Sequence, residues 1–132
     1  MSDGEKRLAG LYVLVVDDEI ARPTQKLIEN MGGRAVSATS IATAREVFRA
    51  IRVDVLLIDL LLMNGNGAEF IAEIRRGRPK FPCVLFSGFD LDRTELGFEA
   101  VLLPKPFSAD QLADALLRAF ERADTEPPGA SE

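Results

Sequence analysis

Five polar residues directly follow short apolar runs of this sequence, at positions where a chemical site could form. They are Asp17, Asp18, Asp59, Ser87 and Lys105. The apolar runs, which predict buried strands, are Leu11–Val16, Val53–Ile58, Phe81–Phe86 and Val101–Leu103. In open parallel sheets, ligands bind beyond the carboxyl ends of the strands. The five side chains are therefore candidates for one common site.

The residue types indicate phosphoryl chemistry. Three carboxylates at one sheet edge repel one another unless a cation or protons intervene. Mg²⁺ is the simplest such cation because it prefers oxygen ligands and works with phosphates. A carboxylate left partly free could attack a phosphoryl group, with Lys105 and Ser87 supplying a charge and a hydrogen-bond donor. Taken singly, Asp59 could be a helix cap, Ser87 a turn residue and Lys105 a solvated lysine, but all five at one edge favour a site.

The composition excludes several other chemistries. The 132 residues include no histidine, so Ser-His-Asp and Cys-His catalysis and His-ligated metals are excluded, as is a role as phosphohistidine donor. The single cysteine, Cys83, allows no intramolecular disulfide and is expected in the core. The net charge is −5, with no basic block that favours nucleic acid. Since neither a signal peptide nor a membrane-spanning run is visible, we expect a soluble cytoplasmic protein.

Helical patterns separate the expected strands. One runs from Ile20 to Gly32-Gly33, a second begins at a Thr39 or Ser40 cap, a third runs from about Asn66 to Gly77, and the last begins at the capping box Ser108–Gln111. A weak strand, Arg34–Ser37, is expected at an edge. The βα pattern repeated five times predicts an α/β fold, with a doubly wound, five-stranded parallel sheet of flavodoxin-like order 2-1-3-4-5.

The domain boundaries follow from the same pattern. We expect residues 1–10 to be an N-terminal extension, 11–122 to form one domain, and 123–132 to be a disordered tail, because the tail is small, acidic and proline-bearing. The stretch Asp90–Gly97 is ambiguous and holds at most one or two helical turns. A DNA-binding module cannot fit in the roughly ten residues after the last expected helix.

As an ordered set, four motifs resemble the receiver domain of bacterial two-component response regulators. They are Val15–Glu19 (VVDDE), Asp59 with Gly67 eight residues on, Ser87-Gly88, and Lys105-Pro106-Phe107. The resemblance covers about Tyr12 to Phe120. It implies a phosphorelay signalling module, not an enzyme, in which Asp59 accepts a phosphoryl group from the phosphohistidine of a histidine kinase or phosphotransfer protein.

The resemblance also implies a role for each remaining site residue. Asp18 would ligate Mg²⁺ directly and Asp17 mostly through water, with Asp59 and the backbone carbonyl of Leu61 completing the protein ligands. Lys105 would contact the phosphoryl group and Asp59, and Ser87 would hydrogen-bond a phosphoryl oxygen. In similar domains the bond that corresponds to Lys105–Pro106 is cis. The output would be contact with a downstream protein target, without DNA or membrane binding.

Departures from the family pattern leave alternatives open. The usual switch aromatic is Leu102 here, with Phe89 as a candidate substitute, and the short Ser87–Lys105 spacing predicts a shortened fourth helix. The chain is expected to be a single-domain regulator, but it could be the receiver of a hybrid kinase or an interaction-only module. Two further alternatives are weaker. A Mg²⁺-dependent phosphatase usually needs an acidic residue at the position that Leu61 occupies here. A flavin-binding module needs a phosphate-cradling loop after the first strand, and this sequence has none there.

Overall fold

A five-stranded parallel sheet forms the centre of the molecule. The computed structural model describes residues 6–60, 67–87 and 99–124. The strands lie in the order β2-β1-β3-β4-β5 and all pair in parallel. Their bounds are Tyr12–Val16 (β1), Arg34–Ala38 (β2), Val55–Asp59 (β3), Cys83–Ser87 (β4) and Val101–Pro104 (β5). The predicted doubly wound α/β fold and its strand order are therefore confirmed.

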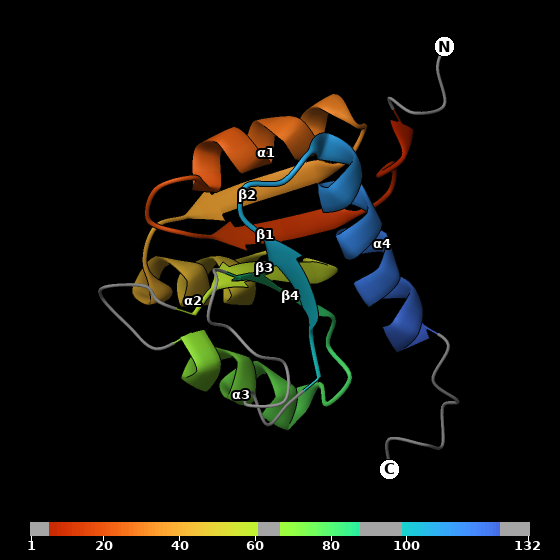
Figure 1. The fold of residues 1–132 in the computed structure, drawn as a ribbon. Coiled ribbons are helices and arrows are strands. Elements are labelled where there is room, and N and C mark those ends of the chain that lie inside the picture. The colour runs from red at the N-terminus through yellow and green to blue at the C-terminus, as the bar shows by residue number, and fades with distance from the viewer. Residues whose placement is uncertain (1–5, 61–66, 88–98, 125–132) are drawn as a thin grey trace.

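Helices cover both faces of this sheet (Figure 1). Within the described residues they are α1 (Ala21–Asn30), α2 (Ile41–Ala50), α3 (Gly67–Gly77) and α4 (Ala109–Asp124). One core cluster joins α1 and α4 to the sheet, and a second joins α2 and α3. Alternate residues of β1 enter the two clusters: Val13 and Val15 enter the first, and Leu14 and Val16 the second. Because both faces are covered, the central strands are apolar up to the polar residues that end β3 and β4, Asp59 and Ser87.

Local sequence signals begin two of the helices as predicted. The hydroxyl of Ser40 accepts a hydrogen bond from the backbone N–H of Thr43 at 3.1 Å and caps α2. Ser108 and Gln111 form the capping box of α4. The Ser108 hydroxyl accepts from the Gln111 N–H at 3.1 Å, and the Gln111 side chain accepts from the Ser108 N–H at 2.8 Å. These bonds satisfy helix N–H groups that have no partner within the helix.

The structure corrects several predicted boundaries. β3 and β4 each begin two residues later than predicted. For β3 the reason is that Asp54 lies outside the ladder, where its carboxylate accepts a hydrogen bond from the Tyr12 N–H at 2.9 Å. For β4 the reason is that Pro82 has no N–H to donate to the ladder. α4 continues to Asp124, past the predicted end near Arg122, so the predicted disordered tail cannot begin at residue 123. Three predictions concern residues outside the described part of the chain. They are the disordered tail over 125–132, the shortened helix in Asp90–Gly97, and the role of Phe89.

Two smaller predictions are confirmed. Cys83 is a core residue with 2% of its surface exposed, and burial raises the pKa of its thiol to about 11. The Lys105–Pro106 peptide bond is cis.

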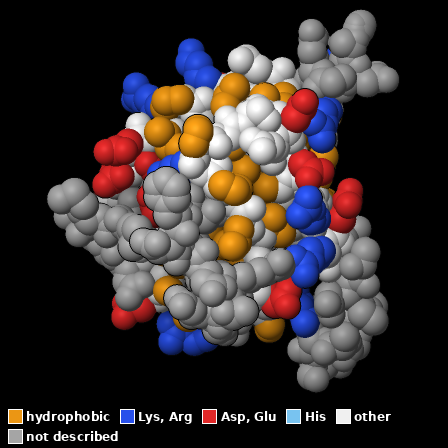
Figure 2. Space-filling view, in the orientation of Figure 1, with side chains coloured by type: hydrophobic (Ala, Val, Ile, Leu, Met, Phe, Trp, Pro, Cys, Tyr) orange, Lys and Arg blue, Asp and Glu red, His pale blue; other side chains and the backbone are white. Residues whose placement is uncertain are grey.

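None of the helices that the structure describes is long and apolar enough to cross a membrane. In Figure 2, hydrophobic side chains gather in the middle of the displayed face and charged side chains lie around them.

Part of the expected N-terminal extension packs into the core. Leu8 is fully buried within the cluster of α1 and α4, and its N–H donates to the carbonyl of Met31 at 2.9 Å. A Cβ at Gly33 would lie 3.0 Å from the Cβ of Leu8, so a larger residue there would require the two closely packed segments to shift. The segment before β1 thus contributes to the same core as the sheet.

We expect Leu8→Ala to lower the free energy of unfolding by about 3 kcal/mol, because it leaves a cavity beneath α1. Urea unfolding followed by circular dichroism measures this change. Lys6→Ala is the matched control, since Lys6 is exposed, and should change stability by less than about 0.5 kcal/mol. Equal stability of the two variants would show that Leu8 is not part of the core.

Candidate functional site

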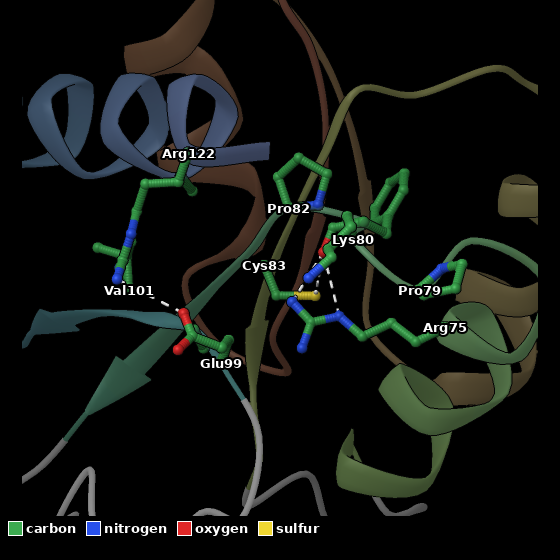
Figure 3. Close-up of a pocket in the computed structure, with 11 residues that line it drawn as sticks. Arg75, Pro79, Lys80, Pro82, Cys83, Glu99, Val101 and Arg122 are labelled. Atoms are coloured by element: carbon green, nitrogen blue, oxygen red, sulfur yellow. Dashed lines mark hydrogen bonds and ion pairs between the residues drawn. The ribbon is translucent and has the colours of Figure 1, made fainter. Parts of the chain in front are cut away.

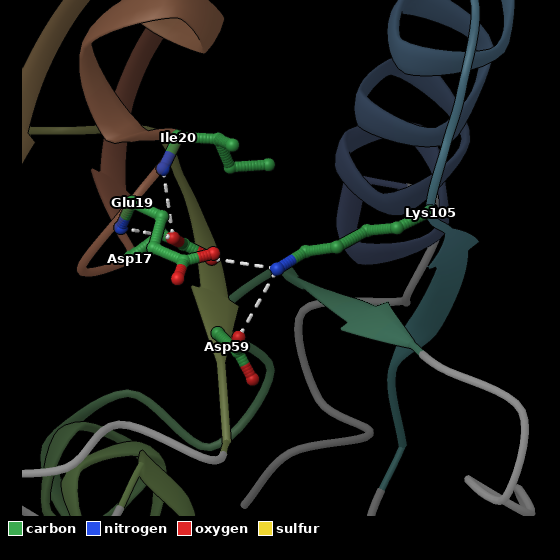
Figure 4. A network of polar contacts seen from close by, with 5 residues as sticks. All are labelled: Asp17, Glu19, Ile20, Asp59 and Lys105. Carbon is green, nitrogen blue, oxygen red and sulfur yellow. Dashed lines mark hydrogen bonds and ion pairs between the residues drawn. The ribbon is translucent and has the colours of Figure 1, made fainter.

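The carboxyl ends of β1, β3 and β5 bring three predicted site residues together. Asp17 follows β1, Asp59 ends β3, and Lys105 follows β5. Val16 pairs with Ile58, so β1 and β3 end side by side. The Lys105 ammonium lies 2.9 Å from Oδ2 of Asp17 and 3.2 Å from Oδ2 of Asp59 (Figure 4). One lysine therefore bridges two carboxylates at the edge where the sequence predicted a site.

Asp17 is the buried anchor of this cluster. Its Oδ1 accepts the N–H groups of Glu19 at 2.7 Å and Ile20 at 2.9 Å, just before α1 begins. Burial alone raises the pKa of its carboxyl. The two backbone N–H bonds and the Lys105 ammonium outweigh that effect, so the pKa lies below the ordinary value of 3.8. Asp17 is therefore ionised throughout the neutral range and holds the lysine in place.

Lys105 is positioned by aromatic packing as well as by charge. Its ammonium lies 4.9 Å from the ring centroid of Phe86, and Phe86 stacks on Phe107 with centroids 5.7 Å apart. Partial burial lowers the pKa of Lys105, but the bonds to Asp17 and Asp59 outweigh it and the pKa is raised. The sequence analysis missed the role of Phe86. The sequence did contain one signal for it, because Phe86 directly precedes the predicted site residue Ser87.

Asp59 is the more accessible of the two bridged carboxylates. Its side chain is 18% exposed, against 1% for Asp17, so an incoming group can reach it. Gly67 lies where α3 begins, close to the end of β3. A Cβ there would lie 3.1 Å from the Cα of Leu60 and 3.3 Å from the carbonyl oxygen of Asp59. The glycine eight residues after Asp59 thus allows α3 to approach the site.

The other predicted site residues are placed less fully. Asp18 is exposed beside the cluster. Ser87 ends β4 next to Pro104, at the same edge, but its side chain and the whole of Leu61 lie outside the described residues. Within residues 6–60, 67–87 and 99–124, no three acidic or cysteine side chains lie close enough to hold a metal. The converging carboxylates of Asp17 and Asp59 fit Mg²⁺ only in a mode in which water supplies much of the coordination.

This arrangement of fold and site defines a family. The profile of the response regulator receiver domain matches residues 13–117. The chain belongs to this family, which comprises signalling modules. All four motifs of the resemblance lie within the matched segment.

Relatives of this chain include response regulators and sensor kinases. It is 31% identical over 124 residues to the response regulator protein VraR of Staphylococcus epidermidis, covering 84% of this chain and 57% of VraR. It is 27% identical to the sensor kinase CckA of Brucella abortus, covering 85% of this chain and 13% of CckA. The chain thus spans only part of the length of these relatives.

Solved structures agree with the fold. A response regulator receiver domain protein from Clostridium thermocellum matches with a TM-score of 0.75 and 26% identity, covering 86% of this chain and 97% of that one. NtrX from Brucella abortus matches with a TM-score of 0.76 and 25% identity, covering 86% of this chain and 27% of NtrX. The predicted receiver identity is therefore confirmed.

The shifted pKa values give the site a defined pH dependence. Because folding lowers the pKa of Asp17, its ionisation stabilises the folded state above its unfolded value of 3.8, and this contribution is lost as the pH falls through the lower folded value. The raised pKa of Lys105 acts in the opposite direction. Its contribution is complete below 10.5 and is lost as the pH rises through the higher folded value.

We expect Lys105→Met to raise the pKa of the Asp17 carboxyl, because the neighbouring ammonium is removed. The variant should also lose about 1–2 kcal/mol of stability, a modest amount because Lys105 is one-third exposed and water screens the pair. Carboxyl carbon chemical shifts followed against pH measure the pKa. Lys105→Arg is the control that keeps the charge, and an unchanged Asp17 pKa in Lys105→Met would refute the bridge.

Proposed function

We propose that this receiver domain accepts a phosphoryl group on Asp59 and thereby switches its contacts with a downstream protein. The observation that carries the proposal is the Lys105 ammonium shared between buried Asp17 and more exposed Asp59. Such a cation beside an accessible carboxylate is what phosphoryl transfer to an aspartate requires, because negative charge accumulates on the equatorial phosphoryl oxygens.

In the proposed reaction, a carboxylate oxygen of Asp59 attacks phosphorus and a new O–P bond forms. The P–N bond to the histidine of the donor breaks. Its electron pair stays on the imidazole nitrogen, which takes up a proton from solvent. Lys105 neutralises charge on the phosphoryl oxygens, and the Ser87 hydroxyl donates a hydrogen bond to one of them. Asp17 stays ionised and keeps the ammonium directed at the acceptor.

We propose that Mg²⁺ is required for this step. Asp17, Asp18 and Asp59 would hold the ion together with the carbonyl of Leu61. When bound, Mg²⁺ supplies further positive charge for the phosphoryl oxygens. Two converging carboxylates and few other protein oxygens suit an ion that keeps several waters. Lys105 supplies only one positive charge against the two carboxylates that it bridges, so the site has room electrostatically for a cation.

The donor that we propose is a histidine kinase or a phosphotransfer protein. Two observations support this choice. The chain has no histidine of its own, so the phosphoryl group must come from another molecule. Relatives of this chain carry the names of sensor kinases, among them CckA and the autoinducer 1 sensor kinase/phosphatase LuxN of Vibrio campbellii.

Phosphorylation would act on the molecule through charge. It replaces the single negative charge of the Asp59 carboxylate with a phosphoryl group that carries about −1.5 to −2 charges and further acceptor oxygens. This group would compete for the present bonds of Lys105. Leu102 is partly buried in β5 and packs against the core cluster of α2 and α3. Because this position holds no aromatic ring, we propose that the signal does not rely on an aromatic switch there.

Intact-mass spectrometry after incubation with acetyl phosphate tests the proposal. We expect one added phosphoryl group, with acetate as leaving group, only when Mg²⁺ is present and Asp59 is intact. Asp59→Asn should take up none. Asp114→Asn is the matched control, since Asp114 is an exposed carboxylate paired with Arg118 on α4, and it should be modified like the unaltered protein.

The outcomes separate the alternatives. Modification of Asp59→Asn, or modification without Mg²⁺, would contradict the proposed acceptor or the proposed metal. If no adduct forms, beryllofluoride with Mg²⁺ shows whether the site binds a phosphoryl mimic. Binding of the mimic assigns the failure to the donor. Absence of both adduct and mimic binding in the folded protein would support an interaction-only module and overturn the proposal.

A further inference from the structure

The strand order requires Lys105 to reach across the end of β4. This strand lies between β5, which Lys105 follows, and the two strands that lead to Asp59 and Asp17. Figure 4 shows the lysine side chain extended toward both carboxylates. A lysine stem is flexible and loses much conformational freedom when its ammonium is held at one point. A side chain at the end of β4 is therefore well placed to support the ammonium.

Phe86 is the residue of β4 that meets the lysine on this path. In the ladder it pairs with Asp59 on one side and with Leu103 on the other. Leu57, Phe86 and Leu103 all belong to the core cluster of α1 and α4. Because side chains alternate along a strand, Asp59, two residues after Leu57, lies on that same face of the sheet. The ring is therefore the direct neighbour of the acceptor, and the Lys105 ammonium lies 4.9 Å from its centroid.

The fold holds the Phe86 ring in place independently of the lysine. Only 3% of Phe86 is exposed. Phe107 stacks on its ring at an interplanar angle of 20° and a centroid distance of 5.7 Å. Phe107 in turn packs against the core cluster of α1 and α4, and Ser108, the next residue, caps α4. The ring is thus a fixed surface on which the mobile end of Lys105 can rest.

A ring face can hold an ammonium without competing for its N–H groups. Lys105 donates to Asp17 at 2.9 Å and to Asp59 at 3.2 Å. The negative face of an aromatic ring attracts the charge itself and requires no particular N–H group. The lysine can therefore exchange a carboxylate oxygen for a phosphoryl oxygen while its ammonium stays beside the ring. An acidic side chain at position 86 would instead form a competing ion pair, and an aliphatic one would not attract the charge.

We propose that Phe86 is a positioning residue for phosphoryl transfer, whose ring keeps the Lys105 ammonium beside Asp59 before and after the phosphoryl group arrives. This inference rests on the proposed function of Asp59 as phosphoacceptor. A cation that is already in place stabilises the transition state without having to be moved there during the reaction. Loss of the ring face therefore slows the transfer, whereas Asp59 remains able to accept the group.

Phe86→Leu removes the ring and keeps a buried apolar side chain. Without any phosphodonor, the Cε protons of Lys105 should move downfield in the NMR spectrum of this variant, because the shielding by the ring face is lost. With acetyl phosphate and Mg²⁺, the rate of Asp59 modification, followed by intact mass, should fall about fivefold, which corresponds to about 1 kcal/mol.

A phenylalanine trifluorinated on its ring, placed at position 86, separates charge from shape. Fluorine withdraws electron density from the ring face and changes the volume of the ring little, so the rate should fall nearly as far as in Phe86→Leu. The same replacement at Phe81 is the matched control. Phe81 is also buried, with 2% exposed, but it lies at the opposite edge of the sheet, at a pocket between the ends of α3 and α4 (Figure 3). There the replacement should leave the transfer rate unchanged.

Two results would overturn the proposal. Unchanged Lys105 proton shifts in Phe86→Leu would show that the ammonium does not lie against the ring. Equal transfer rates for the fluorinated ring at positions 86 and 81 would show that Phe86 serves packing alone. Failure of the unaltered protein to accept a phosphoryl group is a different result. It overturns the proposed function, while shifted Lys105 protons would still show that Phe86 holds the ammonium. Thermal unfolding of each variant verifies that the fold is intact.

Discussion

The bridge from Lys105 to Asp17 and Asp59 is the interaction on which the site depends. A carboxylate as buried as Asp17 is costly unless its charge is compensated. Here two backbone N–H groups and one ammonium compensate it. The same ammonium then lies beside Asp59, which is more exposed. The burial of Asp17 therefore fixes the position of the Lys105 ammonium beside Asp59.

The fold makes this bridge possible because parallel strands all end at the same edge. Asp17 and Lys105 are 88 positions apart in the chain. They come within hydrogen-bond distance because β1 and β5 end at the same edge of the sheet, and the long lysine side chain spans the strands between them. Both faces of the sheet are covered by helices, so the strand ends are among the few places where polar side chains can meet. The stacking of Phe107 on Phe86 secures the last of these ends.

Charge is distributed unevenly between the two edges of the sheet. Acidic residues gather where the strands end, around Asp17 and Asp59. Basic residues gather at the opposite edge, where helices end, as with Arg49 on α2 and Arg75 and Arg76 on α3. Cations at helix carboxyl ends are favourable because they meet the negative end of the helix dipole. This rule by itself produces a basic edge, and the pocket between α3 and α4 gives that edge a concave form.

The sequence by itself determined the order of the elements, the sheet topology and the candidate residues of the site. Apolar runs, helical spacing and caps are local signals, and they specified the fold with errors of about two residues at strand and helix ends. Only the tertiary structure decided that Lys105 contacts Asp17 more closely than Asp59, that Leu8 joins the core, and that Phe86 lies beneath the lysine. The pocket at the opposite edge also had no sequence signal. The physical reason is that these features depend on distances between segments far apart in the chain, which local patterns do not encode.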